Sequence, residues 1–217
     1  MAVNEAAESG IDAGEFGAWL NAMRAALRGE SGMQVPCGEC RGCCISGYSI
    51  RVRPEDLGAR THIPERHLVY RGAMAVMPAQ PDGRCPMAIP EGCAIYPHRP
   101  QTCLDYDCRV FAAAGIDAGD AGKVVINTRV RAWRFSYADE ATRHRHEAVR
   151  AAAAFMRNHP QAFPAGRVPL NPMSIAVFAV KGYAVFLEPG IEAQDPQVIA
   201  AAILKAALEF DAGSGAG

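Results

Sequence analysis

The chain has 217 residues, with 22 Lys and Arg against 23 Asp and Glu and a formal net charge of −1 at pH 7. This balance argues against the strong basic excess of most nucleic-acid-binding proteins, and the length suits one domain. Residues 1–14 have neither the basic nor the apolar segment of a secretory signal, so a cytoplasmic location is expected. In that reducing compartment the eight cysteines are expected to be metal ligands rather than disulfides.

The N-terminal part is predicted to be a tail followed by one helix. Residues 1–14 are predicted to be a disordered tail. Residues 15–28 place large apolar side chains at helical spacing, and Gly29 is the expected stop. One amphipathic helix is therefore expected to open the domain.

The first four cysteines form a tight run, at Cys37, Cys40, Cys43 and Cys44. Two overlapping Cys-x-x-Cys turns with glycines between them let thiolates converge on one ion. The spacing Cys-x2-Cys-x2-Cys matches the first part of a bacterial ferredoxin motif, but the usual fourth ligand is missing. Either Cys44 or a later cysteine would replace it, and the ligand type leaves an iron–sulfur cluster and zinc both open.

Short elements are predicted after this run. Residues 48–52 alternate enough to form a strand, and Pro54 and Pro64 suit the first turns of short helices. Between residues 77 and 109 Pro and Gly are frequent, so we expect loops whose shape is set by a metal.

The other four cysteines, Cys85, Cys93, Cys103 and Cys108, lie in this loop-rich stretch. A fold that joins the two groups would supply one or two four-thiolate sites. The segment 37–108 has equal numbers of acidic and basic side chains, so metal cations would be needed to hold eight thiolates together. The metal-free protein is therefore expected to be partly unfolded.

Arg99 and Tyr96 are the predicted supporting residues of the metal site. Prolines on both sides of Arg99 stiffen the backbone before the next cysteine. Arg99 is placed to donate to a sulfur or to the carboxylate of Asp105 or Asp107, and the alternative is a surface ion pair. Tyr96 is expected to pack rather than to react, and no catalytic residue is assigned.

The two cysteine blocks resemble the YkgJ-type cysteine-cluster family, which is described as a zinc- or iron-chelating domain. The resemblance rests on the run 37–44 and, more specifically, on the string Gly-Cys-x-Ile-Tyr-x-x-Arg-Pro-x-x-Cys over residues 92–103. It implies metal chelation and defines no reaction. Members tend to have Arg directly after the cysteine that matches Cys103, whereas here Leu104 follows, and Cys108 is an extra thiol.

A basic region follows the cysteines. Residues 139–158 are predicted to form a long helix with an apolar stripe. Arg129, Arg131 and Arg134 alternate with apolar and aromatic residues, a pattern typical of either a nucleic-acid surface or a solvated face above buried aromatics. The net charge favours the solvated face, so nucleic acid is not the expected partner.

Two further helices are predicted near the C-terminus, over residues 171–185 and 195–210. Each begins with an N-capping residue followed by proline. Lys181 and Lys205 interrupt apolar runs that are too short to span a membrane. These helices are expected to pack against the metal-binding segment.

The predicted fold is therefore mainly α, a single domain over residues 15–211. Several helices surround the irregular metal-binding segment 37–108, with at most short strands, a helical part at 123–211 and a flexible tail at 212–217. We favour an iron–sulfur cluster over zinc because of the triple Cys-x2 run, with a redox or electron-transfer role and an unknown protein partner. The alternative is a structural-zinc module whose Arg-rich surface binds a protein or nucleic acid.

Overall fold

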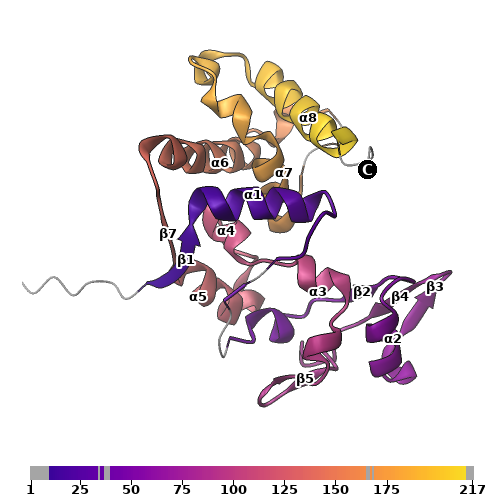
Figure 1. The fold of residues 1–217 in the computed structure, drawn as a ribbon. Coiled ribbons are helices and arrows are strands. Elements are labelled where there is room, and N and C mark those ends of the chain that lie inside the picture. The colour runs from indigo at the N-terminus through magenta and orange to yellow at the C-terminus, as the bar shows by residue number, and fades with distance from the viewer. Residues whose placement is uncertain (1–9, 34, 37–39, 165–166, 168, 214–217) are drawn as a thin grey trace, which may run out of the picture.

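Helices dominate the computed structural model, as predicted, and the strands of its described part are short. The model describes residues 10–33, 35–36, 40–164, 167 and 169–213. The C-terminal helices lie at one end and the cysteine-rich segment at the other, with helix α1 (Phe16–Leu27) between them (Figure 1). No helix in these residues is both long and apolar enough to pass through a bilayer.

The first helix begins where the sequence predicts. The Glu15 carboxylate accepts hydrogen bonds from the backbone N–H groups of Gly17 at 2.8 Å and Ala18 at 2.6 Å. A negative charge at this end also complements the helix dipole. Gly29, at φ 77°, follows the last turn in the left-handed conformation that only glycine adopts without strain.

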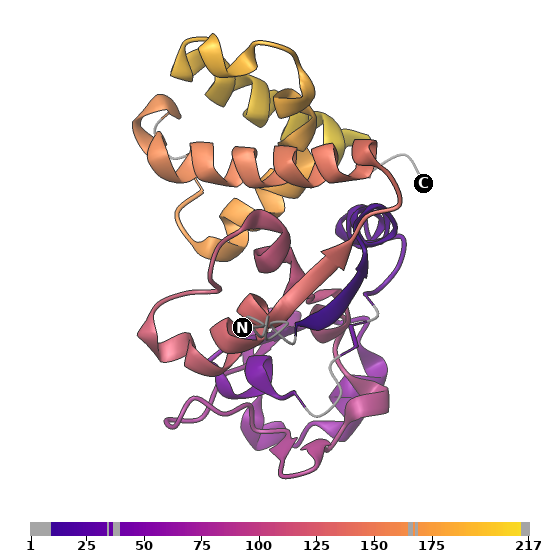
Figure 2. The same cartoon turned by 90° about the vertical axis from the view of Figure 1, so that its left-hand side faces the viewer.

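The predicted N-terminal tail is too long. Ile11–Glu15 forms strand β1, which pairs in parallel with β7 (Trp133–Ser136). The two strands lie side by side below α1 (Figure 2). The prediction of a disordered tail was wrong for residues 11–14. Their hydrogen-bond partners in β7 lie far away in the chain, and local sequence patterns do not reveal such distant partners.

The first half of the cysteine-rich segment folds around a small sheet. Strands β2 (Ile50–Val52), β4 (Met74–Met77) and β3 (Val69–Arg71) form an antiparallel sheet in that order, flanked by α2 (Leu57–His62). The predicted strand at 48–52 is confirmed by β2. A cluster that we call the small core lies in this half, and its buried members are Val52, Ala59, Ile63, Leu68, Ala75, Met77, Met87 and Ile95.

The stretch predicted as loops contains short elements. A hairpin of β5 (Ala88–Ile89) and β6 (Gly92–Cys93) is followed by the short helix α3 (Gln101–Asp105). Gly92, the first residue of β6, has φ 141° and directly follows the two-residue turn of this hairpin, a conformation that glycine adopts without strain. These elements are nevertheless no longer than five residues, so the segment remains irregular.

Five helices follow in the described residues, and the predicted starts of α6, α7 and α8 are confirmed. They are α4 (Arg109–Ala114), α5 (Val124–Ala132), α6 (Glu140–Asn158), α7 (Pro172–Gly182) and α8 (Pro196–Ala212). The side chains of Asp139, Asn171 and Asp195 accept the capping hydrogen bonds of α6, α7 and α8. The helix predicted for 171–185 ends as an α-helix at Gly182 and continues as a 3-10 helix over Tyr183–Leu187.

The C-terminal helices contact the cysteine-rich segment through α4. Helix α4 begins directly after Cys108 and packs against both α6 and α7. A larger cluster, which we call the main core, unites side chains of α1 and α4 to α8, and Cys108 is one of its members. The cysteine-rich segment therefore contains the small core and borders the main core.

A buried histidine joins α6 to α1 in the main core. His146 is 7 % exposed, and its ring stacks on that of Phe16 at a centroid distance of 4.2 Å. Its Nδ1 lies 2.7 Å from the hydroxyl of Tyr137. Burial, helped by the positive charge of Arg150, lowers the pKa of His146 from 6.5 to about 4.

We expect this histidine to make the fold sensitive to acid. Because the pKa of His146 is lower in the folded state, the stabilisation by neutral His146 is fully present above pH 6.5 and is lost as the pH falls towards 4. This pKa shift corresponds to about 3 kcal/mol of unfolding free energy. Urea unfolding of the protein and of His146→Phe at pH 7 and pH 4.5 tests this. The variant should lose less stability on acidification, and equal losses would show that His146 is not responsible.

Candidate metal centre

Seven of the eight predicted cysteine ligands lie in the described residues, and none of the seven forms a disulfide. Cys108 is buried, and the others are half-buried. Cys37 lies outside the described residues, so its predicted role is not tested.

Four thiols gather beside the β5–β6 hairpin, and we call them the hairpin centre: Cys44, Cys85, Cys93 and Cys103. The backbone N–H of Cys85 donates to the carbonyl of Cys44 at 2.7 Å, so the two cysteine blocks are joined directly. Burial raises the pKa of the Cys103 thiol to about 12, and negative charge at the three other sulfurs adds to this rise. The four sulfurs are therefore close enough to repel one another when ionised.

Backbone N–H groups lie near two of these sulfurs. Those of Met87 and Ala88 lower the pKa of the Cys85 thiol and that of Ile95 lowers the pKa of Cys93, while the Ala88 N–H itself donates to the Cys85 carbonyl at 2.9 Å. Burial is the larger effect and raises the pKa of both thiols. Hydrogen bonds of this kind favour the thiolate and support sulfur bound to a metal. The turns after both cysteines thus suit metal ligation.

Arg99 lies where its charge acts on the hairpin centre. Its guanidinium lies 3.7 Å from the centroid of the Tyr96 ring, and its Nε donates to the Tyr96 carbonyl at 2.9 Å. The positive charge of Arg99 lowers the pKa of Cys44, Cys93 and Cys103. This arrangement supports the thiolate form electrostatically.

The predicted carboxylate partners of Arg99 are otherwise engaged. Asp105 interacts with Arg53 at 3.4 Å, and Asp107 interacts with Arg109 at 2.8 Å. Both carboxylates thus bind other arginines, and Arg99 acts towards the sulfurs instead.

Cys44 is the most acidic of the thiols whose pKa is shifted. A hydrogen bond with the neighbouring Cys43, at a sulfur–sulfur distance of 3.9 Å, is the main cause, and Arg99 and Arg41 add to it. Together these contacts lower the pKa of Cys44 to about 7. Part of this thiol is therefore ionised at neutral pH.

Three further thiols line a different space, and we call them the cavity thiols: Cys40, Cys43 and Cys108. They border a cavity of about 70 Å³, together with Tyr106 and with Cys103 of the hairpin centre. Gly42 brings the cysteine run against α5, because a Cβ at this position would lie only 3.2 Å from the Cα of Ile126. The absence of a side chain at Gly42 is thus a requirement of this close approach.

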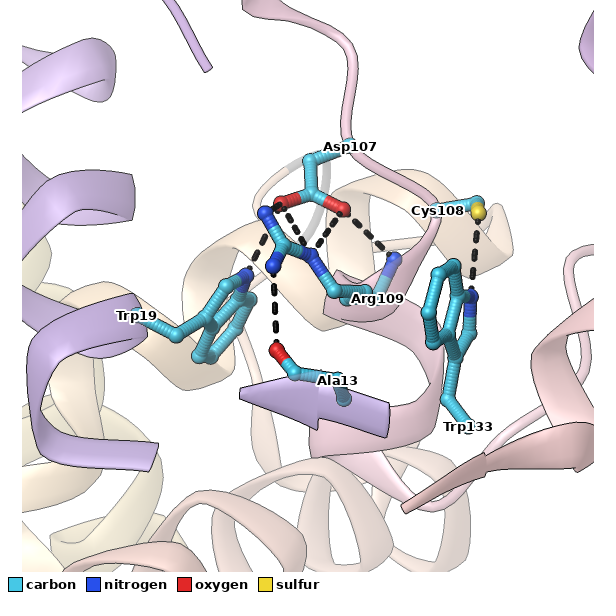
Figure 3. A network of polar contacts seen from close by, with 6 residues as sticks. All are labelled: Ala13, Trp19, Asp107, Cys108, Arg109 and Trp133. Atoms are coloured by element: carbon cyan, nitrogen blue, oxygen red, sulfur yellow. Dashed lines mark hydrogen bonds and ion pairs between the residues drawn. The ribbon is translucent and has the colours of Figure 1, made fainter. Parts of the chain in front are cut away.

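Cys108 is fixed by a buried polar network that the sequence did not predict. The Asp107 carboxylate accepts from the Arg109 guanidinium and from Trp19 Nε1 at 2.9 Å, and Arg109 also donates to the Ala13 carbonyl at 3.0 Å (Figure 3). Cys108 lies between these two charged residues in the chain. We call Asp107, Arg109 and Trp19 the Asp107–Arg109 clamp.

The second tryptophan contacts Cys108 itself. Trp133 Nε1 donates to the Cys108 sulfur at 3.3 Å, from the strand β7 (Figure 3). Cys108 was taken as an extra thiol from the sequence, because it falls outside the family string. The structure gives it a fixed position and an N–H donor.

The cysteine thiols are of a ligand type that suits zinc or iron. The candidate ligand side chains that the structure describes, however, do not lie close enough together to coordinate one ion. Soft thiolates with N–H donors are the ligands that zinc and iron prefer. Within the described part of the chain, no three His, Cys, Asp or Glu side chains form a group that could hold a metal ion. Binding would therefore have to draw these thiols together, which couples it to folding.

The arginines of the predicted Arg-rich surface contact their own chain. Arg131 pairs with Asp117, and Arg134 donates to the carbonyls of Arg131 and Trp133. Arg129 lies over the Trp133 ring and donates to the Pro36 carbonyl at 2.9 Å. These contacts support local structure, and the predicted partner stays a prediction.

Residues 36–120 match a protein-family model, CxxCxxCC, which is described as "Putative zinc- or iron-chelating domain". The match covers less than half of the chain and includes all eight cysteines. No curated protein and no solved structure matches the chain. The family model thus indicates zinc or iron chelation by the cysteine-rich segment, without choosing between the metals.

Proposed function

We propose that this protein chelates zinc or iron through the hairpin centre and exchanges ions or electrons with a partner. The observation that carries the proposal is the convergence of Cys44, Cys85, Cys93 and Cys103 from separate loops. Each of the first three sulfurs raises the pKa of Cys103, which supports a shared site for the four. The match of residues 36–120 to a zinc- or iron-chelating domain supports the same function.

The hairpin centre supplies what a four-thiolate site needs. Cys85 and Cys93 would present sulfurs whose thiolate form nearby backbone N–H groups favour. Arg99 would offset part of the negative charge of the bound thiolates. A bound zinc or iron ion would supply the positive charge that lets four neighbouring thiols ionise together.

The partial exposure of the thiols favours a centre that exchanges ions or electrons rather than a sealed structural site. All four sulfur-bearing residues of the hairpin centre are half-buried rather than buried. A purely structural zinc is usually enclosed by its four ligands. Partial exposure favours a centre that a partner or a small ligand reaches.

Metal analysis with a visible spectrum, on protein purified without oxygen, tests the proposal. Iron with acid-labile sulfide and a brown colour would identify a cluster and direct the next experiment to redox titration. Colourless protein with stoichiometric zinc would identify a zinc centre. Protein that carries neither metal and binds neither on addition would contradict the proposed function.

The Cys85→Ser variant locates the metal. It should lose bound metal, because a thiolate ligand is replaced by a hydroxyl that binds zinc and iron weakly. Tyr70→Phe is a matched control, since it removes one hydroxyl, bonded to Glu65 at 3.1 Å, from the neighbouring sheet and touches no sulfur. Equal metal content in the two variants would remove Cys85 from the centre.

A further inference from the structure

A cleft lies where the cysteine-rich segment meets the helical part of the protein. Its volume is about 370 Å³, and its lining comes from helices α1, α3, α4 and α7 and from β2 with its neighbours in the chain. None of the described cysteines lines it. Sites for small molecules usually have volumes of about 300–1,000 Å³. The cleft is therefore large enough for a small organic molecule, and the proposed metal site does not use it.

Part of the lining, which we call the polar lining, consists of Ser49, Arg51 and Arg53. The residues between them, Ile50 and Val52, pack in the small core instead. This alternation follows from strand geometry, because successive side chains of a strand point to opposite faces. The face of β2 that turns away from the small core therefore brings two arginines to the cleft.

Hydrogen bonds hold the polar lining against α3. The Asp56 carboxylate accepts from the backbone N–H of Arg53 at 2.7 Å and from that of Gln101 at 2.9 Å. The Thr102 hydroxyl donates to the Arg51 carbonyl at 2.8 Å. A backbone that is already ordered loses less conformational entropy when a ligand binds. The arginines are thus carried by a strand that is fixed in position before binding.

Another part of the lining is apolar, and we call it the apolar lining. Met23 and Leu27 of α1 belong to it, as do Met173 and Val177 of α7. Each pair is spaced by one helical turn, so each presents one face of its helix to the cleft. Methionine side chains adapt to the shape of what they contact. The cleft therefore combines an apolar surface with a surface rich in hydrogen-bond donors.

The charges around the cleft leave one arginine for a ligand. Arg53 lies 3.4 Å from the Asp105 carboxylate, and Asp107, which also lines the cleft, is paired with Arg109 at 2.8 Å. Within the described part of the chain, the exposed Arg51 guanidinium has no hydrogen-bond or ion-pair partner. One positive charge is therefore uncompensated at the cleft.

We propose that this cleft binds a small carboxylate with an apolar body, with the carboxylate at Arg51 and the body on the apolar lining. Arginine binds a carboxylate through two parallel hydrogen bonds, and the Ser49 hydroxyl is a further donor. One uncompensated positive charge favours a carboxylate over a phosphate group, which carries about two negative charges at neutral pH. The proposal does not depend on metal binding and goes beyond the proposed function.

Methionine methyl NMR of the full chain as purified tests this proposal, with octanoate as the probe. Met23 and Met173 line the cleft, whereas Met77 and Met87 lie in the small core and serve as internal controls. We expect saturable shifts of the Met23 and Met173 signals and unchanged signals of Met77 and Met87. Octanol has the same chain without the charge, and it should bind at least about tenfold more weakly because the charged hydrogen bonds are lost.

Variants of the lining locate the two parts of the ligand. Arg51→Gln removes the charge and keeps a long polar side chain, so its affinity for octanoate should fall about tenfold and its affinity for octanol should stay the same. Arg66→Gln is the matched control, because Arg66 is exposed and does not line the cleft, and it should bind octanoate as the wild type does. Met173→Gln should weaken the binding of both probes. Unchanged Met77 and Met87 signals verify that each variant is folded.

Three outcomes would overturn the proposal. Absence of shifts, or shifts of all four signals that never saturate, would show that the cleft binds no such ligand. Equal affinities for octanoate in Arg51→Gln and Arg66→Gln would show that Arg51 does not hold the carboxylate. Tighter binding of octyl phosphate than of octanoate would overturn the assignment to a carboxylate. Each of these outcomes leaves the proposed function standing, because metal content is measured separately.

Discussion

Removal of the bound metal is expected to open the small core while the main core stays folded. The small core has eight buried members, and Cys85 and Cys93 pack against it. So few buried side chains seldom support an independent fold, and bound metal commonly supplies the missing stability. The main core is several times larger and contains no cysteine of the hairpin centre among its buried members.

Hydrogen exchange with and without a chelator measures this effect. Amides of residues 50–98 should exchange much faster after metal removal, by about 100-fold or more if a few kcal/mol of local stability is lost. Amides of α6 (Glu140–Asn158) serve as an internal control and should change little. Equal acceleration in both regions would show one cooperative unit, and no change in either would show that metal does not hold the small core.

Replacement of Asp107 by Ala is expected to destabilise the protein by about 3–5 kcal/mol, because it breaks a buried ion pair. Asp107 is 1 % exposed and Arg109 is 7 % exposed. The substitution leaves the Arg109 guanidinium buried without its carboxylate, and Trp19 Nε1 loses its acceptor at 2.9 Å. Each of these losses is unfavourable in a site that water does not reach.

Urea unfolding of the chelator-treated protein isolates this effect from metal binding. Asp117→Ala is the matched control, since Asp117 also pairs with an arginine, Arg131, whose side chain is 68 % exposed. An exposed pair of this kind contributes about 0–1 kcal/mol. Similar losses of unfolding free energy in Asp107→Ala and Asp117→Ala would show that the clamp does not stabilise the fold.

The clamp also fixes the position of Cys108. Asp107 and Arg109 hold the backbone on both sides of Cys108, and α4 begins at Arg109.

Most helices could be predicted from the sequence because their signals are local. The cap at Asp139 and the apolar stripe of α6 lie within the helix they define, and the Asn171-Pro172 and Asp195-Pro196 pairs mark their own helices. The pairing of β1 with β7 could not be predicted in this way. A parallel pair joins strands that are distant in the chain, and each strand alone is too short to show a clear period.

The sequence by itself predicts which side chains carry the chemistry: cysteines in a tight run and a second group, with Arg99 between two prolines. Residue type and spacing are enough for this, because a metal selects ligands by their chemistry and the short turns that hold them. Only the tertiary structure decided how the thiols are divided between the hairpin and the cavity, and which buried groups hold Cys108 in place. The position of Cys108 depends on the contacts of Trp19 with Asp107 and of Trp133 with Cys108, which packing brings together from separate parts of the chain.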